Sequence, residues 1–161
     1  MKNNKRIIWF LALFVLLMAV NFGCSSSNDD DDNSNNNGSN NSIGNVVNTV
    51  NNGSWRITNY FDTDHNETSN FTGYNFVFGS GNVLTATNGS TIHKGSWSVT
   101  DSNSSDDDLS DLHFNINFAA PADFEELSDD WEIVSKSATV IQLRDVSGGG
   151  GGTDLLTFTK N

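Results

Sequence analysis

The stretch LHFNINF, residues 112–118, decides the fold class of this chain. Apolar and polar side chains alternate in it without a break, and neighbouring side chains of a β-strand point to opposite faces. One face is therefore expected to cover a core with Leu112, Phe114, Ile116 and Phe118. The other face carries His113, which we expect to point to solvent. This period of two predicts a strand of an antiparallel sheet with one face buried.

Similar short runs stand on both sides of this stretch, and Gly, Asn, Asp and Ser residues separate them. Asn88-Gly89 is the strongest hairpin signal, because both residues tolerate positive φ. About eight strands are expected in all. Besides 112–118 they lie near residues 53–61, 74–78, 83–87, 91–100, 131–134, 138–145 and 153–159. No long crossover separates adjacent runs, so the predicted fold is all-β: an antiparallel up-and-down meander that closes into a small barrel.

One short helix is expected near residues 121–127. Pro121 suits the first turn of a helix, and the acidic residues after it favour the N-terminal end of the helix dipole. Phe124 and Leu127 are three residues apart, which places them on one face of the helix. These two side chains are expected to plug one end of the barrel.

The N-terminal residues follow the order of an export signal. Three basic residues within the first six positions precede an apolar run over residues 7–20. That run is shorter than the roughly 20 apolar residues that cross a membrane. Gly23-Cys24 follows it and resembles the lipobox of bacterial lipoproteins, whose cysteine receives lipid. We expect a lipoprotein signal peptide over residues 1–23 and lipidation of Cys24, including palmitate; an ordinary signal-peptidase cut is the alternative.

Residues 24–52 are almost entirely Ser, Asn, Asp and Gly, and such a stretch cannot bury enough apolar surface to become ordered. A disordered tether is expected there, although the apolar spacing within residues 43–50 fits a short helical turn. The acidic run Asp29–Asp32 resembles the surface-export signal of lipoproteins in the Bacteroidota. It implies display on the outer membrane surface; the alternative is a protein that faces the periplasm. The folded domain is expected over residues 53–161.

Charge limits the partners of the mature chain. Five basic and 20 acidic residues follow Cys24, which gives a formal net charge of −15. Nucleic acid is disfavoured, because phosphate binding needs a basic patch. Anionic lipid headgroups repel such a chain too, so the lipid on Cys24 must provide the membrane attachment. Cys24 is the only cysteine, so no disulfide stabilises the domain, and we expect a monomer.

Gly53-Ser54-Trp55 resembles the G-x-W motif that opens the lipocalin barrel. The wider pattern is similar to that of small lipocalin-like lipoproteins of flavobacteria. It comprises Gly-Tyr-x-Phe-x-Phe at 73–78, Gly-x-Trp-x-Val-Thr at 95–100, Asp-Trp-Glu-Ile at 130–133 and Leu-Thr-Phe at 156–158. In lipocalins the tryptophan closes the barrel floor and a late-strand arginine packs over it. The resemblance therefore implies these two roles for Trp55 and Arg144.

Most aromatic residues of the domain share the apolar face of their strands. A packed core accounts for this pattern, and so does an apolar pocket at a barrel mouth. On the second interpretation, the candidate ligand-binding residues are Trp55, Tyr74, Phe76, Phe78, Trp97, Phe114 and Arg144.

Two acidic segments contain oxygen ligands that could hold a cation. The run Asp62-Thr63-Asp64-His65-Asn66 begins like a calcium loop, but the positions after it lack the required Gly and Glu, so a solvated turn is expected. A denser cluster either binds a cation weakly or keeps a loop soluble. It comprises Asp106, Asp107, Asp108 and Asp111, beside Asp101. No metal site is predicted.

No catalytic motif stands out either. His65, His93 and His113 are scattered without the spacing of a zinc site. The five glycines at 148–152 lack the helix start and lysine of a phosphate-binding loop. We therefore expect no enzyme activity and no cofactor. A hydrolase built from carboxylates is a minor third hypothesis.

The sequence thus predicts a lipid-anchored envelope or cell-surface lipoprotein with a lipocalin-like domain that binds a small apolar ligand. The alternative is a structural or interaction module of the envelope, with a filled core and no enzymatic role.

Overall fold

The computed structural model describes residues 43–102, 108–147 and 151–161. The signal peptide, Cys24 and most of the predicted tether lie outside these residues, as do Asp106, Asp107 and Gly148–Gly150. The strands are β1 (Trp55–Asp62), β2 (His65–Asn66), β3 (Asn75–Phe78), β4 (Val83–Asn88), β5 (Thr91–Asp101), β6 (Leu112–Asn117), β7 (Asp129–Lys136), β8 (Val140–Val146) and β9 (Thr153–Lys160). The helices are α1 (Ile43–Asn51), η1 (Thr68–Phe71), η2 (Ser80–Asn82), η3 (Leu109–Asp111) and α2 (Ala122–Glu125).

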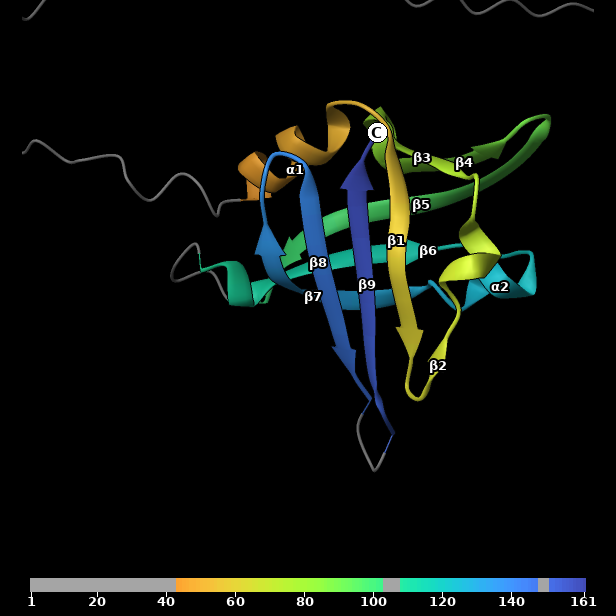
Figure 1. Ribbon diagram of the computed structural model, residues 1–161. Helices are drawn as coiled ribbons and strands as arrows, with labels where there is room; N and C mark the ends of the chain where they lie inside the picture. Colours follow the sequence, from red (N-terminus) through yellow and green to blue (C-terminus); the bar gives the residue numbers. More distant parts are fainter. Residues whose placement is uncertain (1–42, 103–107, 148–150) are drawn as a thin grey trace, which may run out of the picture. The chain divides into compact units, whose positions relative to one another are not determined.

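The strands form one antiparallel up-and-down barrel, as predicted. From β3 to β9 each strand pairs with the next along the chain, and β1 closes the barrel by pairing with both β9 and β3. In Figure 1, β8, β9 and β1 run side by side down one wall, and β5 and β6 cross behind them. The predicted hairpin at Asn88-Gly89 is confirmed, with Asn88 paired to Thr91 and Gly89 at a φ of 58°.

The seam between β1 and β3 is short, because only Trp55 and Phe76 pair across it. Farther along, β1 pairs instead with β2, a two-residue strand that is too short to show a period in the sequence. The turn between β1 and β2 follows Asp62, so the predicted solvated turn is observed and His65 beyond it is exposed. The chain then enters η1, whose Phe71 is buried and fills the seam from inside.

The alternation predicted from residues 112–118 is observed in β6. Leu112, Phe114 and Ile116 are buried, whereas His113 and Asn115 lie on the outer face and are only partly covered. Throughout the described residues, every buried side chain is apolar or aromatic, and no buried side-chain polar atom lacks a hydrogen bond. The barrel is therefore a water-excluding core inside a polar wall.

The helix predicted at the end of the tether is observed as α1 and belongs to the domain. Val46 and Val50, four residues apart on one helix face, are fully buried. The ordered domain therefore begins at least ten residues before Gly53, so the predicted disordered tether is wrong for residues 43–52. The two valines supply the apolar burial that Ser, Asn and Asp lack. The predicted helix near 121–127 is confirmed as α2, and Phe124 and Leu127 are both buried.

Candidate functional site

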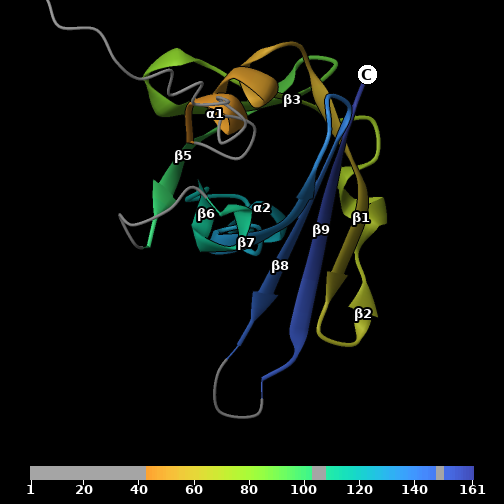
Figure 2. The ribbon, with the colours of Figure 1, turned by 90° about the vertical axis from the view of Figure 1, so that its left-hand side faces the viewer.

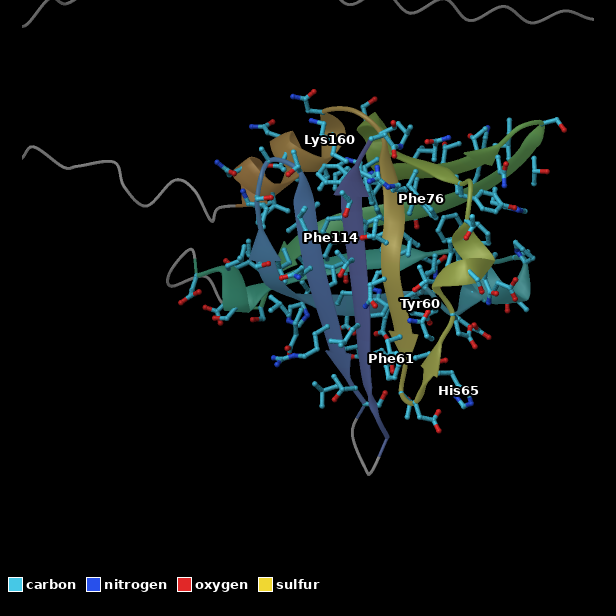
Figure 3. The ribbon with its side chains drawn as sticks, in the orientation of Figure 1. Tyr60, Phe61, His65, Phe76, Phe114 and Lys160 are labelled. Atoms are coloured by element: carbon cyan, nitrogen blue, oxygen red, sulfur yellow. The ribbon has the colours of Figure 1, made fainter. Side chains whose placement is uncertain are left out.

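The barrel interior, proposed from the sequence as a ligand pocket, is filled by its own side chains. Trp55, Phe76, Phe78 and Phe114 are each at most 1% exposed. The ring of Phe78 lies edge-on to that of Phe114 with centroids 5.4 Å apart, and it meets Phe158 at 5.3 Å. Phe76 and Phe114, both labelled in Figure 3, come from β3 and β6 and are fully buried. These spacings are those of contacting rings in a packed core.

One end of the barrel is closed by α1. The indole N–H of Trp55 donates a hydrogen bond to the backbone carbonyl of Val50, with a nitrogen-to-oxygen distance of 2.9 Å. The Lys136 ammonium donates to Oδ1 of Asn45 at 2.6 Å, which ties the start of the helix to the end of β7. Partial burial lowers the pKa of Lys136. The helix is thus held at both ends over the interior.

The opposite end is closed by α2 together with η1. Phe124 lies at the centre of this plug, and its ring contacts those of Phe71, Tyr74 and Phe118 at centroid distances of 5.3, 5.1 and 5.1 Å. The hydroxyl of Tyr60 donates to the carbonyl of Glu126 at 2.9 Å. The predicted plug is therefore observed, with Phe71 as an additional member.

The role predicted for Arg144 was wrong. Leu143 points inward from β8, so strand alternation turns Arg144 outward, where its guanidinium pairs with Glu132 at 2.6 Å. The cation over Trp55 is instead Lys160, whose Nζ lies 5.8 Å from the ring centroid. Leu156, Phe158 and Lys160 are spaced two residues apart in β9, so strand alternation places all three on the inward face. This spacing could have identified Lys160 from the sequence.

Two other predicted site residues lie near the barrel wall and end. Tyr74 is half-buried against Phe124, and its hydroxyl is 3.2 Å from Nε2 of His93. Trp97 is 4% exposed, stacks on Phe114 and donates its indole N–H to the carbonyl of Gly79 at 3.1 Å. The seven predicted residues therefore divide into core, plug and outer surface, and they do not line one common pocket.

The described residues form several hollows on the outside of the barrel, one of them, of about 250 Å³, beside α1 and Lys160. Another, of about 390 Å³, lies between η3 and the outer side of β7 and β8, lined by Leu109, Glu132 and Arg144 among others. A third, of about 240 Å³, lies between α1, η2 and β5. A fourth, of about 150 Å³, lies over β5 and β6. Phe76, Phe78 and Phe114 line none of these four hollows.

Acidic side chains gather beside the plugged end, with carboxylate oxygens of Asp62, Glu67 and Glu126 within 4.8 Å of one another. A hydrogen bond with Glu67 raises the pKa of Glu126, and burial and the neighbouring negative charges raise it further. Burial raises the pKa of the nearby Tyr60 hydroxyl as well. These carboxylates could supply oxygen ligands to a cation, and a shared proton also accounts for their proximity.

A second acidic group comprises Asp129, Asp130 and Asp145, at the neighbouring ends of β7 and β8. Burial raises the pKa of Asp129. The three histidines have separate surroundings. His65 contacts Asp64, His93 contacts Tyr74, and Nδ1 of His113 is 3.2 Å from the carbonyl of Asp130.

In the part of the chain that the structure describes, no helix has the length and apolar character needed to span a membrane.

Comparisons with known proteins give one neighbour. No family model matches the sequence, and no curated protein matches it. Among solved structures, the chain is similar to the crystal structure of a DUF4847 family protein from Bacteroides vulgatus ATCC 8482, with a TM-score of 0.46 and 15% sequence identity. The match covers 72% of this chain and 97% of that one. A likeness of this size carries no inference about what either protein binds.

Proposed function

We propose that this protein is a lipid-anchored, non-enzymatic interaction module of the cell envelope, with a lipocalin-like barrel that serves as a solid scaffold. It binds its partner on the outside of the barrel. The sequence predicts either a barrel that binds a small apolar ligand or an interaction module with a filled core, and this proposal is the second of these.

The observation that carries this choice is the filled interior. Apolar ligand sites are cavities that bury most of the ligand. Here Phe78 occupies the middle of the barrel, in ring contact with Phe114 and Phe158. Both ends are covered as well, one by α1 and the other by Phe124. A ligand would have to displace several packed aromatic rings, and each displaced ring loses the contacts that bury it.

The anchor is supported by the sequence. Cys24 follows an export-type segment, and the acidic chain behind it needs lipid to stay at an anionic membrane. The acidic run Asp29–Asp32 supports an outer-membrane position with the domain on the cell surface. On this proposal the protein acts as a monomer.

Binding of the apolar fluorophore 1-N-phenylnaphthylamine tests the solid scaffold. We expect no saturable fluorescence increase with the wild-type chain. The variant Phe114→Ala opens space in the core, so it is expected to bind the probe. Saturable binding by the wild type, with shifts in the NMR signals of Phe76 and Phe114, would restore the interior-ligand hypothesis.

Metabolic labelling with an alkyne-bearing palmitate tests the anchor. We expect label on the wild-type chain and none on Cys24→Ser. Ser25→Ala, which leaves the cysteine in place, serves as the control and should be labelled like the wild type. Protease treatment of intact cells then tests surface display, and complete protection would place the domain on the periplasmic side.

A further inference from the structure

Strand β5 extends past its neighbour β4 on one side of the barrel. The first residue of β4, Val83, pairs with Ser96, and β5 continues from Trp97 to Asp101 beyond that pair. Because β4 does not reach this part of β5, α1 and η2 pack beside it instead of a strand. Figure 2 shows α1 next to β5 at this end of the barrel. The wall here is built from a strand edge, a helix and a loop.

Two outer hollows meet at this place. The hollow between α1, η2 and β5 and the hollow over β5 and β6 share three lining residues, Asn82, Trp97 and Ser98. Their volumes are about 240 and 150 Å³. Each is smaller than the roughly 300 Å³ at which pockets for drug-sized ligands begin. A ligand made of small linked units could place one unit in each of the two adjoining hollows.

Three of the polar side chains that line these hollows have no hydrogen-bond partner within the described residues. Within the described residues, the side chains of Asn82, Ser98 and Asn117 make no hydrogen bond. Asn115, which also lines one hollow, is already bonded, because its amide donates to the Thr100 hydroxyl at 3.0 Å. On the opposite wall, the Ser135 hydroxyl likewise donates to Gln142 at 2.6 Å. An amide offers both donors and an acceptor, and a hydroxyl offers the same on one atom.

The lining of both hollows is also neutral. Among the described residues, no charged side chain lines either hollow, although the chain as a whole has a formal net charge of −12. An anionic ligand would meet the repulsion of the whole molecule, and a cationic ligand would find no carboxylate among these lining residues. The lining therefore favours an uncharged ligand rich in hydroxyl or amide groups.

Trp97 supplies the apolar part of the lining. Its indole N–H is bonded to the Gly79 carbonyl, which fixes the ring, and the residue is only 4% exposed. Amide and hydroxyl groups match the hydroxyls at the rim of a sugar ring, and the small exposed part of Trp97 adds an apolar contact beside them.

We propose that the surface formed by Asn82, Trp97, Ser98 and Asn117 binds a neutral glycan. This inference deepens the proposed function, since it names the partner class and the part of the outer surface that binds it. Asn82 reaches the site from a loop position with a φ of 63°, and Ser98 and Asn117 reach it from β5 and β6.

Affinity electrophoresis of the full chain in mild detergent tests the proposal. Native gels contain dextran, laminarin, yeast mannan or xyloglucan as neutral polysaccharides, and dextran sulfate as the charged counterpart of dextran. We expect at least one neutral polysaccharide to retard the wild type, and dextran sulfate to retard it less than dextran does.

Asn117→Ala and Ser98→Ala should each weaken that retardation about tenfold, as expected for the loss of one good hydrogen bond. Gln142→Ala removes an exposed amide from the opposite wall and should leave it unchanged. Thermal melting confirms that the variants are folded.

The proposal is overturned if none of the four neutral polysaccharides retards the protein, if dextran sulfate retards it as strongly as the neutral polysaccharides do, or if Asn117→Ala binds like the wild type. None of these results bears on Cys24 labelling or on the uptake of 1-N-phenylnaphthylamine. Failure of the glycan site and failure of the solid, lipid-anchored scaffold are therefore distinguishable.

Discussion

The side chain of Thr68 bonds to both backbone groups of Tyr60. Its hydroxyl accepts a hydrogen bond from the Tyr60 amide at 2.8 Å and donates one to the Tyr60 carbonyl at 3.3 Å. Tyr60 lies in the part of β1 that β3 does not reach, so Thr68 replaces a missing strand partner. Ser128 does the same for Phe118, at 2.9 and 3.2 Å. At both of these places, a single hydroxyl thus satisfies a backbone donor and a backbone acceptor.

Thr68→Val should lower the free energy of unfolding by about 1–3 kcal/mol, because the buried Tyr60 amide loses its partner. Thr68→Ser keeps the hydroxyl and should recover most of the loss. Thr85→Val, on the outer face of β4, should change stability by no more than about 0.5 kcal/mol. Urea unfolding measures all three variants, and equal losses for Thr68→Val and Thr85→Val would refute the role of the hydroxyl.

Trp55→Phe should loosen α1 specifically. The Val50 carbonyl loses its donor, at a cost of about 1–3 kcal/mol, and the amides of α1 should exchange hydrogen faster. Trp131→Phe is the matched control, because its indole N–H donates to the carbonyl of Leu127, beside α2, at 3.0 Å. Exchange measured by mass spectrometry should therefore rise near α1 in the first variant and near α2 in the second. Uniform acceleration in both would contradict these local roles.

Gly95→Ala should destabilise the barrel by about 1–3 kcal/mol or more, as overpacking does. A Cβ at this position would lie 2.3 Å from the carbonyl oxygen of Asn117 and 2.8 Å from the ring of Phe118. Gly44→Ala in α1 meets no atom within 4 Å and should stabilise the chain, by up to about 1 kcal/mol. Thermal melting should give shifts of opposite sign; the same sign for both would show that close packing is not what requires Gly95.

Glu126→Gln should raise stability at neutral pH and have no effect in acid. The pKa of Glu126 is raised in the fold, so the native state binds more protons than the unfolded chain, and stability falls as pH rises from the ordinary glutamate pKa through the raised value. The substitution removes that loss, and the advantage should vanish below about pH 4.3, the ordinary pKa. Melting temperatures against pH measure it. Glu125→Gln removes a charge from the same helix as a control, and an equal gain there would mean that general charge reduction, rather than the contact with Glu67, is responsible.

Alternation along strands was enough to predict the barrel. Phe114 and Ile116 were placed inward from the period of residues 112–118 alone, and the hairpin at Gly89 followed from its tolerance of positive φ. β2 escaped prediction because two residues have no measurable period. The apolar spacing of residues 43–50 predicted the helix, but the polar composition around it assigned the helix to the tether, because only two valines of α1 are buried against the domain.

The candidate site was harder to predict, because a core and a pocket place the same aromatic residues inward. Packing distances decide between them, as Phe78 and Phe114 show, and a sequence does not contain those distances. The resemblance to lipocalins predicted that Arg144 packs over Trp55. Leu143 points inward from the same strand, so alternation places Arg144 on the outer face. The free amides at Asn82 and Asn117 gave no signal, because whether a surface side chain is already bonded depends on its neighbours in space.

The alternation of inner and outer positions also affects how this protein can change over evolution. In the part of the chain that the structure describes, the buried side chains are all apolar or aromatic, and every charged side chain is at least partly exposed. Mutations on the outer faces of β5 and β6 can therefore accumulate at little cost to the core, since exposed substitutions usually shift stability only slightly. The barrel can acquire or lose recognition of a partner one surface residue at a time while its fold persists.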